Sequence, residues 1–330
     1  MREPFAAFRV EKDEKGVRAG FRELALQDLP QGEILIAVQW SAVNFKDGLA
    51  TIPTGNVVRR YPLIPGIDLA GTVVHSDDAG IPEGSEVLAT GYDIGVSHHG
   101  GYAQYARLPA GWVVPLPQGL SARDAMAIGT AGLTAAIAIA RLEENGLRPE
   151  NGPVLVTGAS GGVGCLAVDM LAHLGYAVEA STGKMGEAAF LRALGAQEVF
   201  PREELTPQEV RALDRQRWAA AIDPVGGKTL ATALSRLRYG GSVASVGLTG
   251  GSGLETTVFP FILRGANLLG IDSAYLPMES RRSLWQRLAG DLRPPHLADV
   301  TDEVALSDLP AALERILAGG VRGRLVVRID

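Results

Sequence analysis

The stretch Val154-Leu-Val-Thr-Gly158-Ala-Ser-Gly161-Gly162-Val-Gly164 decides the fold of this chain. An apolar run that is typical of a buried strand leads into a glycine cluster, and a helical pattern follows over 162–174. Glycines permit a tight turn and let backbone N–H groups approach a pyrophosphate, while the helix N-terminus favours the anion. The stretch therefore predicts the phosphate loop of a dinucleotide site, with a plain structural turn as the alternative.

Strand and helix patterns alternate on both sides of this loop. Strands are expected at 153–157, 177–181, 198–200, 218–223, 242–246 and 267–271, with helices at 162–174 and 187–194. Strands that alternate with helices indicate βαβ units and a parallel sheet. The fold class is therefore α/β, with a doubly wound, Rossmann-type cofactor domain.

The chain before residue 121 has a different character, with short strands separated by glycine and proline. Residues 33–41 alternate, and further strands are expected at 67–75, 86–89 and 102–108, with a short helix at 45–50. Ser121 and Asp124 form a capping-box-like start to the next helix. After residue 275 two helices, 279–292 and 307–317, precede a last strand at 324–329. We predict a β-rich domain from 1–122 and 276–330, and a cofactor domain from 123–275.

Composition excludes several classes of protein. The chain has 330 residues, a net charge of −6 and no basic aromatic segment, which disfavours a nucleic-acid partner. Its one cysteine, Cys165, forms neither an intrachain disulfide nor a multi-cysteine zinc site. Residues 1–16 lack an apolar signal region, and the longest uncharged run, 125–140, is shorter than the ~20 residues of a membrane span. We expect a cytoplasmic protein.

The tip of the second predicted strand, Ser181-Thr182-Gly183-Lys184, bears on cofactor choice. In NAD-binding units an acid lies near this tip, ~20 residues after the loop, and binds the ribose hydroxyls. Glu179 comes too early and falls within the strand, whereas hydroxyls, Lys184 and Arg202 suit a 2′-phosphate. These residues favour NADPH over NADH, with solvated surface charges as the alternative. The glycine-rich turn at 247–251 is expected to line the nicotinamide ribose, unless it is a plain turn.

The chain resembles the medium-chain dehydrogenase/reductase superfamily, and most closely the acryloyl-CoA reductase (NADPH) group, whose members are often called quinone oxidoreductases. The matching stretches are Asn44-Phe-Lys-Asp47, 59–71 with Arg59-Arg-Tyr-Pro, 98–105, 127–132, 157–164, 260–265 with Pro260-Phe-Ile-Leu-Arg, 270–273 and 320–324. They run from residue 44 to the C-terminal stretch. The resemblance implies a GroES-like catalytic domain, a Rossmann domain and a homodimer formed partly through the last Rossmann strand, around 267–271.

The resemblance also implies site residues. Cofactor contacts are expected at Phe45, Thr134, Ser160, Gly161, Gly162, Val163, Gly164, Thr182, Gly183, Lys184, Arg202, Leu248, Ile262 and Ser273. Members of the group often have tyrosine at the position of Phe45, so the ring is kept and the hydroxyl is lost. An asparagine contact that some members have near 318–319 is absent here.

Zinc-dependent members hold their metal with Cys, a Gly-His-Glu segment and another Cys or Asp. The corresponding segment here is Gly66-Ile67-Asp68, and no cysteine precedes Cys165. His98 and His99 are adjacent, and neighbouring strand residues point to opposite faces, so the pair does not suit one ion. We predict that no metal is bound.

Without a metal, the expected chemistry is hydride transfer to the β-carbon of an α,β-unsaturated carbonyl, followed by protonation of the α-carbon. Asn44 could donate to the carbonyl oxygen. Asp47, ionised at a usual pKa of ~3.9, would orient a neighbour, and Tyr92 or His98 would supply the proton. The alternatives are a helix-capping Asn44, a surface Asp47 and an ordinary loop His98.

The leading hypothesis is an NADPH-dependent reductase of enoyl thioesters such as acryloyl-CoA. Arg59 and Arg60 could meet coenzyme A phosphates, or be a solvated pair. An NADPH:quinone or alkenal oxidoreductase is the alternative enzyme. A non-catalytic NADPH-binding sensor or structural protein is the alternative of another class, and the intact glycine loop and 44–47 segment argue against it.

Overall fold

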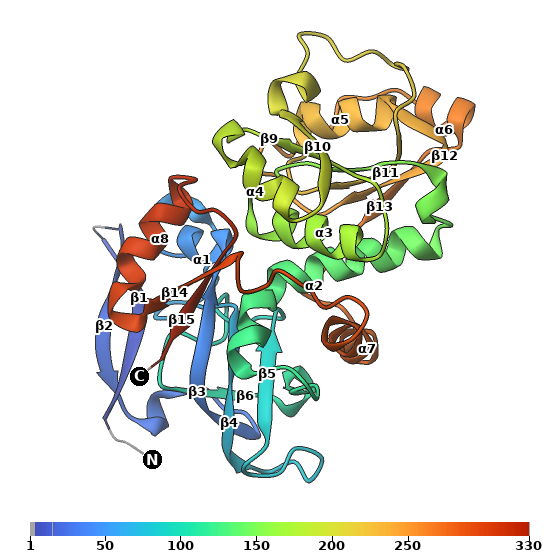
Figure 1. The fold of residues 1–330 in the computed structure, drawn as a ribbon. Coiled ribbons are helices and arrows are strands. Elements are labelled where there is room, and N and C mark those ends of the chain that lie inside the picture. The colour runs from blue at the N-terminus through green and yellow to red at the C-terminus, as the bar shows by residue number, and fades with distance from the viewer. Residues whose placement is uncertain (1–3, 15, 330) are drawn as a thin grey trace. The chain divides into compact units, whose positions relative to one another are not determined.

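The computed structural model describes residues 4–14 and 16–329, and the chain forms two compact units (Figure 1). Unit 1 comprises Met1–Thr130, Ala274–Ala289 and Thr301–Asp330, and unit 2 comprises Ala131–Ser273 and Gly290–Val300. The units differ from the predicted domains at 123–130, 274–275 and 290–300. The domain division at 122/123 and 275/276 stays a prediction.

Unit 2 contains a parallel sheet of six strands in the order β10-β9-β8-β11-β12-β13. The strands are β8 (Val154–Val156), β9 (Val178–Thr182), β10 (Ala196–Pro201), β11 (Trp218–Asp223), β12 (Leu237–Ser245) and β13 (Asn267–Gly270). The chain moves outward from β8 to β10, then restarts at β11 on the other side of β8. This reversal is the topological switch point at which doubly wound sheets bind ligands, at the carboxyl ends of the strands. The predicted Rossmann-type sheet is confirmed.

Helices cover this sheet in the expected alternation. They are α3 (Gly162–His173), α4 (Ala188–Ala193), α5 (Gly227–Ser235) and α6 (Phe259–Arg264), with the short turns η4 (Pro149–Asn151), η5 (Met185–Glu187) and η6 (Arg202–Leu205). Most of α3 is buried, and Cys165 packs within it, as expected of a structural cysteine. Leu155, Trp218 and Leu234 belong to the core between the sheet and its helices.

Unit 1 is built on a mostly antiparallel sheet in the order β14-β15-β3-β4-β5-β7, with β6 also paired to β3. The strands are β3 (Ile34–Val43), β4 (Asp68–Ser76), β5 (Glu86–Thr90), β6 (Tyr105–Leu108), β7 (Val114–Pro115), β14 (Thr301–Ala305) and β15 (Arg324–Arg328). A hairpin of β1 (Phe5–Asp13) and β2 (Gly16–Leu24), which the sequence patterns did not predict, adds a second sheet. The C-terminal strand β15 pairs antiparallel with β3, so it lies in the sheet of unit 1.

The helices of unit 1 are short. They are α1 (Phe45–Leu49), α7 (Met278–Ala289) and α8 (Leu309–Leu317), with η1 (Leu26–Asp28), η2 (Pro53–Gly55), η3 (Ala110–Trp112) and η7 (Leu306–Asp308). One core cluster joins strand residues such as Ile36, Leu69 and Leu325 to Leu313 of α8. This cluster holds β3, β4 and β15 together beneath the polar residues described below.

Helix α2 (Ala122–Glu144) begins as predicted, because the Ser121 hydroxyl accepts the Asp124 N–H at 3.0 Å. It is interrupted at Gly129, whose φ of 51° and ψ of −158° are not helical. Among the described helices, α2 is the one long and apolar enough to span a membrane, yet 83% of its most apolar stretch is buried inside the protein. This burial is the property of a core helix.

Candidate functional site

The glycine loop has the geometry of a pyrophosphate-binding turn. It connects the end of β8 to the start of α3, and Gly158 has a φ of +54°. At Gly164 a Cβ would lie 2.5 Å from the Gly158 carbonyl oxygen and 2.7 Å from the Cα of Ala159. The loop therefore needs glycine for two separate reasons, a left-handed turn and close packing of the helix on the strand.

The tip of β9 gathers hydroxyls and cations beside this loop. The hydroxyls of Ser160 and Thr182 lie 2.9 Å apart, and Thr182 Oγ1 also accepts the Lys184 N–H at 3.0 Å. The Arg202 side chain packs across Gly183, so that a Cβ there would come within about 3.0 Å of it. The structure thus brings Thr182 and Arg202 together with Ser160, and Lys184 is joined to Thr182 through its backbone N–H.

The acid nearest to this tip is engaged elsewhere. Glu179 lies within β9, as predicted, and its carboxylate accepts hydrogen bonds from Arg217 Nε and Trp218 Nε1, each at 2.7 Å. The Glu179 carboxylate therefore has a structural role, in which it binds Arg217 and Trp218. These two hydrogen bonds hold Oε2 of Glu179 against Arg217 and Trp218.

The remaining predicted cofactor residues of unit 2 lie at the same sheet edge or on the surface. Thr134 donates to the Ser273 hydroxyl at 2.9 Å, while Leu248 and Ile262 are 66% and 67% exposed. Sequence reasoning missed Asp223, which ends β11, accepts hydrogen bonds from the Thr157 hydroxyl and from Gly226 N–H, and fixes the neighbouring turn. Burial raises the pKa of Asp223. An acid at the end of a buried strand was the available signal.

In unit 1, Asp47 is fully buried rather than an ordinary surface acid. Its carboxylate accepts the N–H groups of Asn44 at 2.9 Å, Gly66 at 3.2 Å and Ile67 at 3.0 Å. Burial, and then the nearby charge of Asp68, raise the pKa of Asp47 to about 6. The assumption that Asp47 has an ordinary pKa of ~3.9 was therefore wrong.

Asn44, Asp68, Thr130 and Arg324 form a buried polar cluster. Asn44 Nδ2 donates to Asp68 at 2.9 Å, and Arg324 Nη1 donates to Asn44 Oδ1 at 3.1 Å. Thr130 gives Asp68 both its backbone N–H, at 3.0 Å, and its hydroxyl. Asn44 is the residue before α1, but its side chain enters this cluster instead of capping the helix.

Arg324 and Asp68 lie at the interruption of α2. Arg324 Nε donates to the carbonyl of Ala127 at 2.9 Å, just before Gly129, and Asp68 accepts from Thr130, just after it. The arginine thus meets the carbonyl end of one helical turn, and the carboxylate meets the amide end of the next, as the helix dipole favours. Sequence reasoning gave neither residue a role, because they come from β4 and β15.

Tyr92 and His98 lie together around a third aromatic residue of unit 1. The Tyr92 ring stacks on Trp112 with centroids 5.4 Å apart, and the His98 ring meets Trp112 edge-on at 5.2 Å. Tyr92 has a positive φ of 50°, and Arg281 lies 4.5 Å from its ring centroid. Within the described chain, the His98 Nε2 atom is buried without a hydrogen-bond partner. Tyr92 Oη donates to the Leu276 carbonyl at 3.3 Å, and His98 Nδ1 lies 3.1 Å from the His99 carbonyl oxygen, so the hydrogen bonds of these two residues lie apart from those of Asn44 and Asp47.

The last predicted residues of unit 1 lie at the surface. Phe45 is 44% exposed, and Arg59 and Arg60 are exposed. Over residues 4–14 and 16–329, no group of three or more His, Cys, Asp and Glu side chains is arranged to hold a metal ion. Both carboxylates of the buried region, Asp47 and Asp68, already accept hydrogen bonds from protein donors.

Two family models match the chain. The model described as alcohol dehydrogenase GroES-like domain matches residues 30–118, in unit 1. The model described as zinc-binding dehydrogenase matches residues 162–289. Together they support the predicted pairing of a GroES-like domain with a Rossmann domain.

Three relatives match nearly the whole chain. "Putative quinone oxidoreductase YhfP" of Bacillus subtilis is 52% identical over 98% of this chain and 99% of its own, and its solved structure with NAD bound has a TM-score of 0.97. Acrylyl-CoA reductase AcuI of Ruegeria pomeroyi is 49% identical over 99% of both chains. The structure of the yhdH oxidoreductase from Salmonella enterica in complex with NADP is 45% identical, covers 98% of this chain and 100% of its own, and has a TM-score of 0.96.

Proposed function

The chain belongs to the medium-chain dehydrogenase/reductase superfamily of oxidoreductases, and from this premise we propose that it is a zinc-independent, NADPH-dependent reductase of activated carbon–carbon double bonds. Its favoured substrate class is an enoyl thioester such as acryloyl-CoA. The observation that carries the proposal is the tip of β9, where the Ser160 and Thr182 hydroxyls and the Arg202 side chain lie together and Lys184 follows directly in the chain. Glu179 bonds to Arg217 and Trp218 instead.

The residues of unit 2 fit NADPH. Gly164 lets the start of α3 pack against Gly158 and Ala159, and α3 then offers backbone N–H groups to a pyrophosphate. Lys184 and Arg202, with the hydroxyls of Ser160 and Thr182, would hold the 2′-phosphate. When bound, NADPH supplies the hydride for the reaction.

The residues of unit 1 would orient the substrate and move the proton. Asn44 is fixed by Asp68 and Arg324, and its amide nitrogen has a second hydrogen beyond the one that Asp68 accepts. We assign that hydrogen to the substrate carbonyl oxygen, where negative charge develops during reduction. Asp47 positions Asn44 through its backbone N–H, and Tyr92 or His98 supplies the proton to the α-carbon.

Zinc independence rests on the chemistry of the donors. Asp68 is bonded to Asn44, Thr130 and Arg324, and Asp47 to three backbone N–H groups. A metal ion would have to replace these bonds, and thiolate or imidazole ligands are not arranged beside them in the described residues. A metal analysis of the purified protein, with activity measured before and after chelation, tests this point; loss of activity on chelation contradicts it.

The substrate class follows from the relative named acrylyl-CoA reductase and from the surface of unit 1. Arg59 and Arg60 are exposed, and guanidinium groups suit the phosphates of coenzyme A. The relative named as a quinone oxidoreductase favours a second candidate, an NADPH:quinone or alkenal oxidoreductase.

A substrate panel separates the two candidates. NADPH oxidation is followed with acryloyl-CoA, a benzoquinone and a simple enone, each with NADH in parallel. We expect the highest kcat/KM with acryloyl-CoA and NADPH. Equal or faster turnover of the quinone overturns the thioester assignment, a preference for NADH overturns the cofactor assignment, and NADPH binding without turnover of any acceptor favours a sensor.

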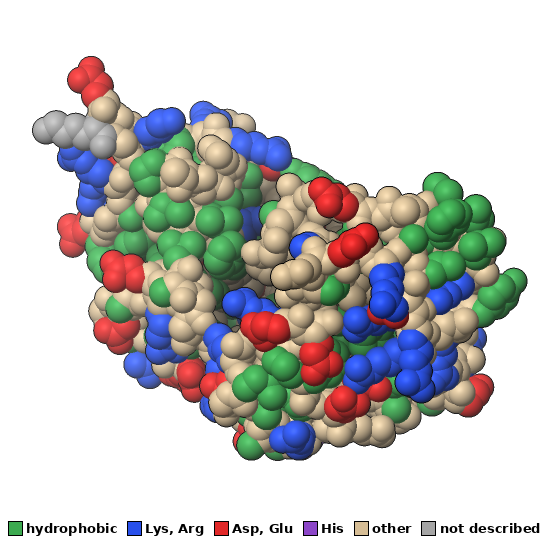
Figure 2. All heavy atoms as spheres, turned by 90° about the horizontal axis from the view of Figure 1, so that it is seen from above, with side chains coloured by type: hydrophobic (Ala, Val, Ile, Leu, Met, Phe, Trp, Pro, Cys, Tyr) green, Lys and Arg blue, Asp and Glu red, His purple; other side chains and the backbone are tan. Residues whose placement is uncertain are grey.

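We also propose a cytoplasmic homodimer formed through the edge strand β13. The surface of α6 and β13 exposes Val258, Phe259, Ile262, Leu263 and Leu268, and Figure 2 shows hydrophobic side chains gathered at one end of the face it draws. An apolar patch beside an unpaired strand edge suits pairing with a second copy of the chain. Light scattering after gel filtration should give twice the chain mass, and Leu268→Glu should give monomers; a monomeric wild type contradicts the proposal.

A further inference from the structure

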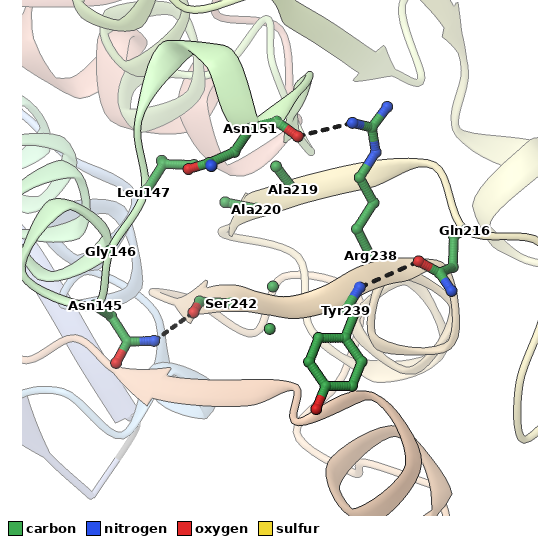
Figure 3. Close-up of a pocket in the computed structure, with 12 residues that line it drawn as sticks. Asn145, Gly146, Leu147, Asn151, Gln216, Ala219, Ala220, Arg238, Tyr239 and Ser242 are labelled. Atoms are coloured by element: carbon green, nitrogen blue, oxygen red, sulfur yellow. Dashed lines mark hydrogen bonds between the residues drawn. The ribbon is translucent and has the colours of Figure 1, made fainter.

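A cavity of about 340 Å³ lies in unit 2 at the amino ends of β11 and β12 (Figure 3). The glycine loop follows the carboxyl end of β8, so this cavity lies at the opposite edge of the sheet from the cofactor residues. Its polar lining includes Asn145, Asn151, Gln216, Arg238 and Ser242. The proposed reductase function uses none of these residues.

Arg238 is exposed but held in a fixed position. Its Nε donates to the Arg217 carbonyl at 3.0 Å, and its Nη1 donates to the Asn151 carbonyl at 2.7 Å. Gly152, with a φ of +123°, leaves the space for the guanidinium, because a Cβ there would lie 2.1 Å from Arg238 Nη1. Figure 3 shows the bond to Asn151 at one end of the pocket and the bond from Asn145 to Ser242 at the other. An arginine held in this way loses little entropy on binding an anion.

The positive charge of Arg238 is not neutralised by a carboxylate among the described ion pairs. A second cavity, of about 610 Å³, shares Gln216 and Arg238 with the first and adds Arg215 to the lining. The acids of this second cavity are already paired: Asp214 with Arg236 at 3.1 Å, and Glu179 and Glu198 with Arg217 at 2.7 and 2.8 Å. The four arginines and three carboxylates of this lining leave one positive charge in excess, and these ion pairs include neither Arg215 nor Arg238.

Neutral polar groups complete the lining of the first cavity. Gln216 Oε1 accepts the Tyr239 N–H at 3.1 Å, which leaves its NH₂ group to donate. Asn145 Nδ2 donates to Ser242 at 2.6 Å, which leaves its carbonyl oxygen to accept. The other lining residues are mostly glycine and alanine, so large apolar side chains contribute little. Such a surface suits a ligand with many hydroxyl groups rather than an apolar ligand.

We propose that this cavity binds a small phosphorylated, hydroxyl-rich molecule of the sugar-phosphate class. Arg238, with Gln216, holds the phosphate, because guanidinium and amide N–H groups suit its oxygens, and Arg215 of the adjoining cavity adds a second guanidinium. Asn145 and Ser242 form hydrogen bonds with the hydroxyl groups of its sugar. The site is separate from the cofactor site, so it does not depend on the proposed reductase activity.

Calorimetric titration tests the site. The protein is first loaded with one equivalent of NADPH, so that the glycine loop does not compete, and is then titrated with glucose 6-phosphate, inorganic phosphate or glucose as probes. We expect binding of glucose 6-phosphate, at least tenfold weaker binding of phosphate, and none of glucose. Arg238→Met should weaken glucose 6-phosphate binding at least tenfold, and Gln216→Leu severalfold.

A matched control is Arg192→Met, an exposed arginine of α4 in the same unit that lines neither cavity. It should bind glucose 6-phosphate as the wild type does, and all variants should bind NADPH alike. No binding at 10 mM probe, or binding that Arg238→Met leaves unchanged, overturns the site. Phosphate that binds as tightly as glucose 6-phosphate overturns the hydroxyl-rich ligand class.

Discussion

The buried polar cluster of unit 1 contrasts with the cofactor edge of unit 2, by which we mean the glycine loop and the tip of β9. The two regions place their polar groups in opposite ways. In the cluster, side chains from the start of α1, from β4, α2 and β15 bond to one another, and Asp68 and Arg324 are almost completely buried. At the cofactor edge, the hydroxyls of Ser160 and Thr182 and the backbone of Lys184 come from successive βα turns, and we propose that they contact NADPH. Removing a partner should therefore cost folding stability in unit 1 and ligand affinity in unit 2.

The largest effect is expected from Arg324→Met. Removal of this buried cation leaves the Asp68 carboxylate uncompensated, which should lower the free energy of unfolding by about 3–5 kcal/mol. Urea denaturation measures the loss. The control is Arg328→Met, an exposed arginine of the same strand, which should cost under about 1 kcal/mol. Equal losses in the two variants would mean that the buried pair has no special role.

The second effect concerns Asp47 and pH. Its folded pKa of about 6 lies above the ordinary aspartate pKa of 3.8, so between these values the folded state binds more protons than the unfolded state. Stability from this group is therefore full below pH 3.8 and is lost as pH rises through 6, by about 3 kcal/mol. Urea denaturation from pH 4 to 7 should show the wild type losing most of this amount relative to Asp47→Asn. Parallel stability curves would contradict the prediction.

The third effect lies in unit 2. Gly164→Ala places a Cβ 2.5 Å from the Gly158 carbonyl oxygen and so displaces the loop from α3. We expect NADPH affinity to fall at least 100-fold, about 2.7 kcal/mol, as measured by fluorescence titration. Gly186→Ala is the matched control, since a Cβ there meets nothing within 4 Å. Wild-type affinity in Gly164→Ala would show that the loop does not hold the cofactor.

The smallest expected effect concerns Lys184 and Arg202, the two cations assigned to the cofactor edge. Lys184→Ala and Arg202→Ala should each weaken NADPH binding about tenfold and leave NADH binding unchanged, because only NADPH carries the 2′-phosphate. The ratio of the two dissociation constants is the measurement. A variant that weakens both cofactors equally would assign its cation to the pyrophosphate or to the fold.

The same contrast explains what could be predicted from the sequence. The glycine loop and the tip of β9 are local features, since β8, the loop and α3 follow one another directly, and both were placed correctly in the fold. The buried cluster could not be assembled in this way, because Asn44 and Arg324 are 280 residues apart and meet only when β15 pairs with β3. The hairpin of β1 and β2 was missed because β2 is mostly exposed and carries little hydrophobic alternation.

The position of Arg324 has a consequence for protein synthesis. A ribosome completes Ala131–Ser273, most of unit 2, before it adds β14 and β15 to the sheet of unit 1. Until then Asp68 lacks its arginine, and one side of β3 lacks its neighbour. We therefore expect unit 2 to fold first on the ribosome. Unit 1, although its synthesis begins earlier, completes its fold only after β15 has been made.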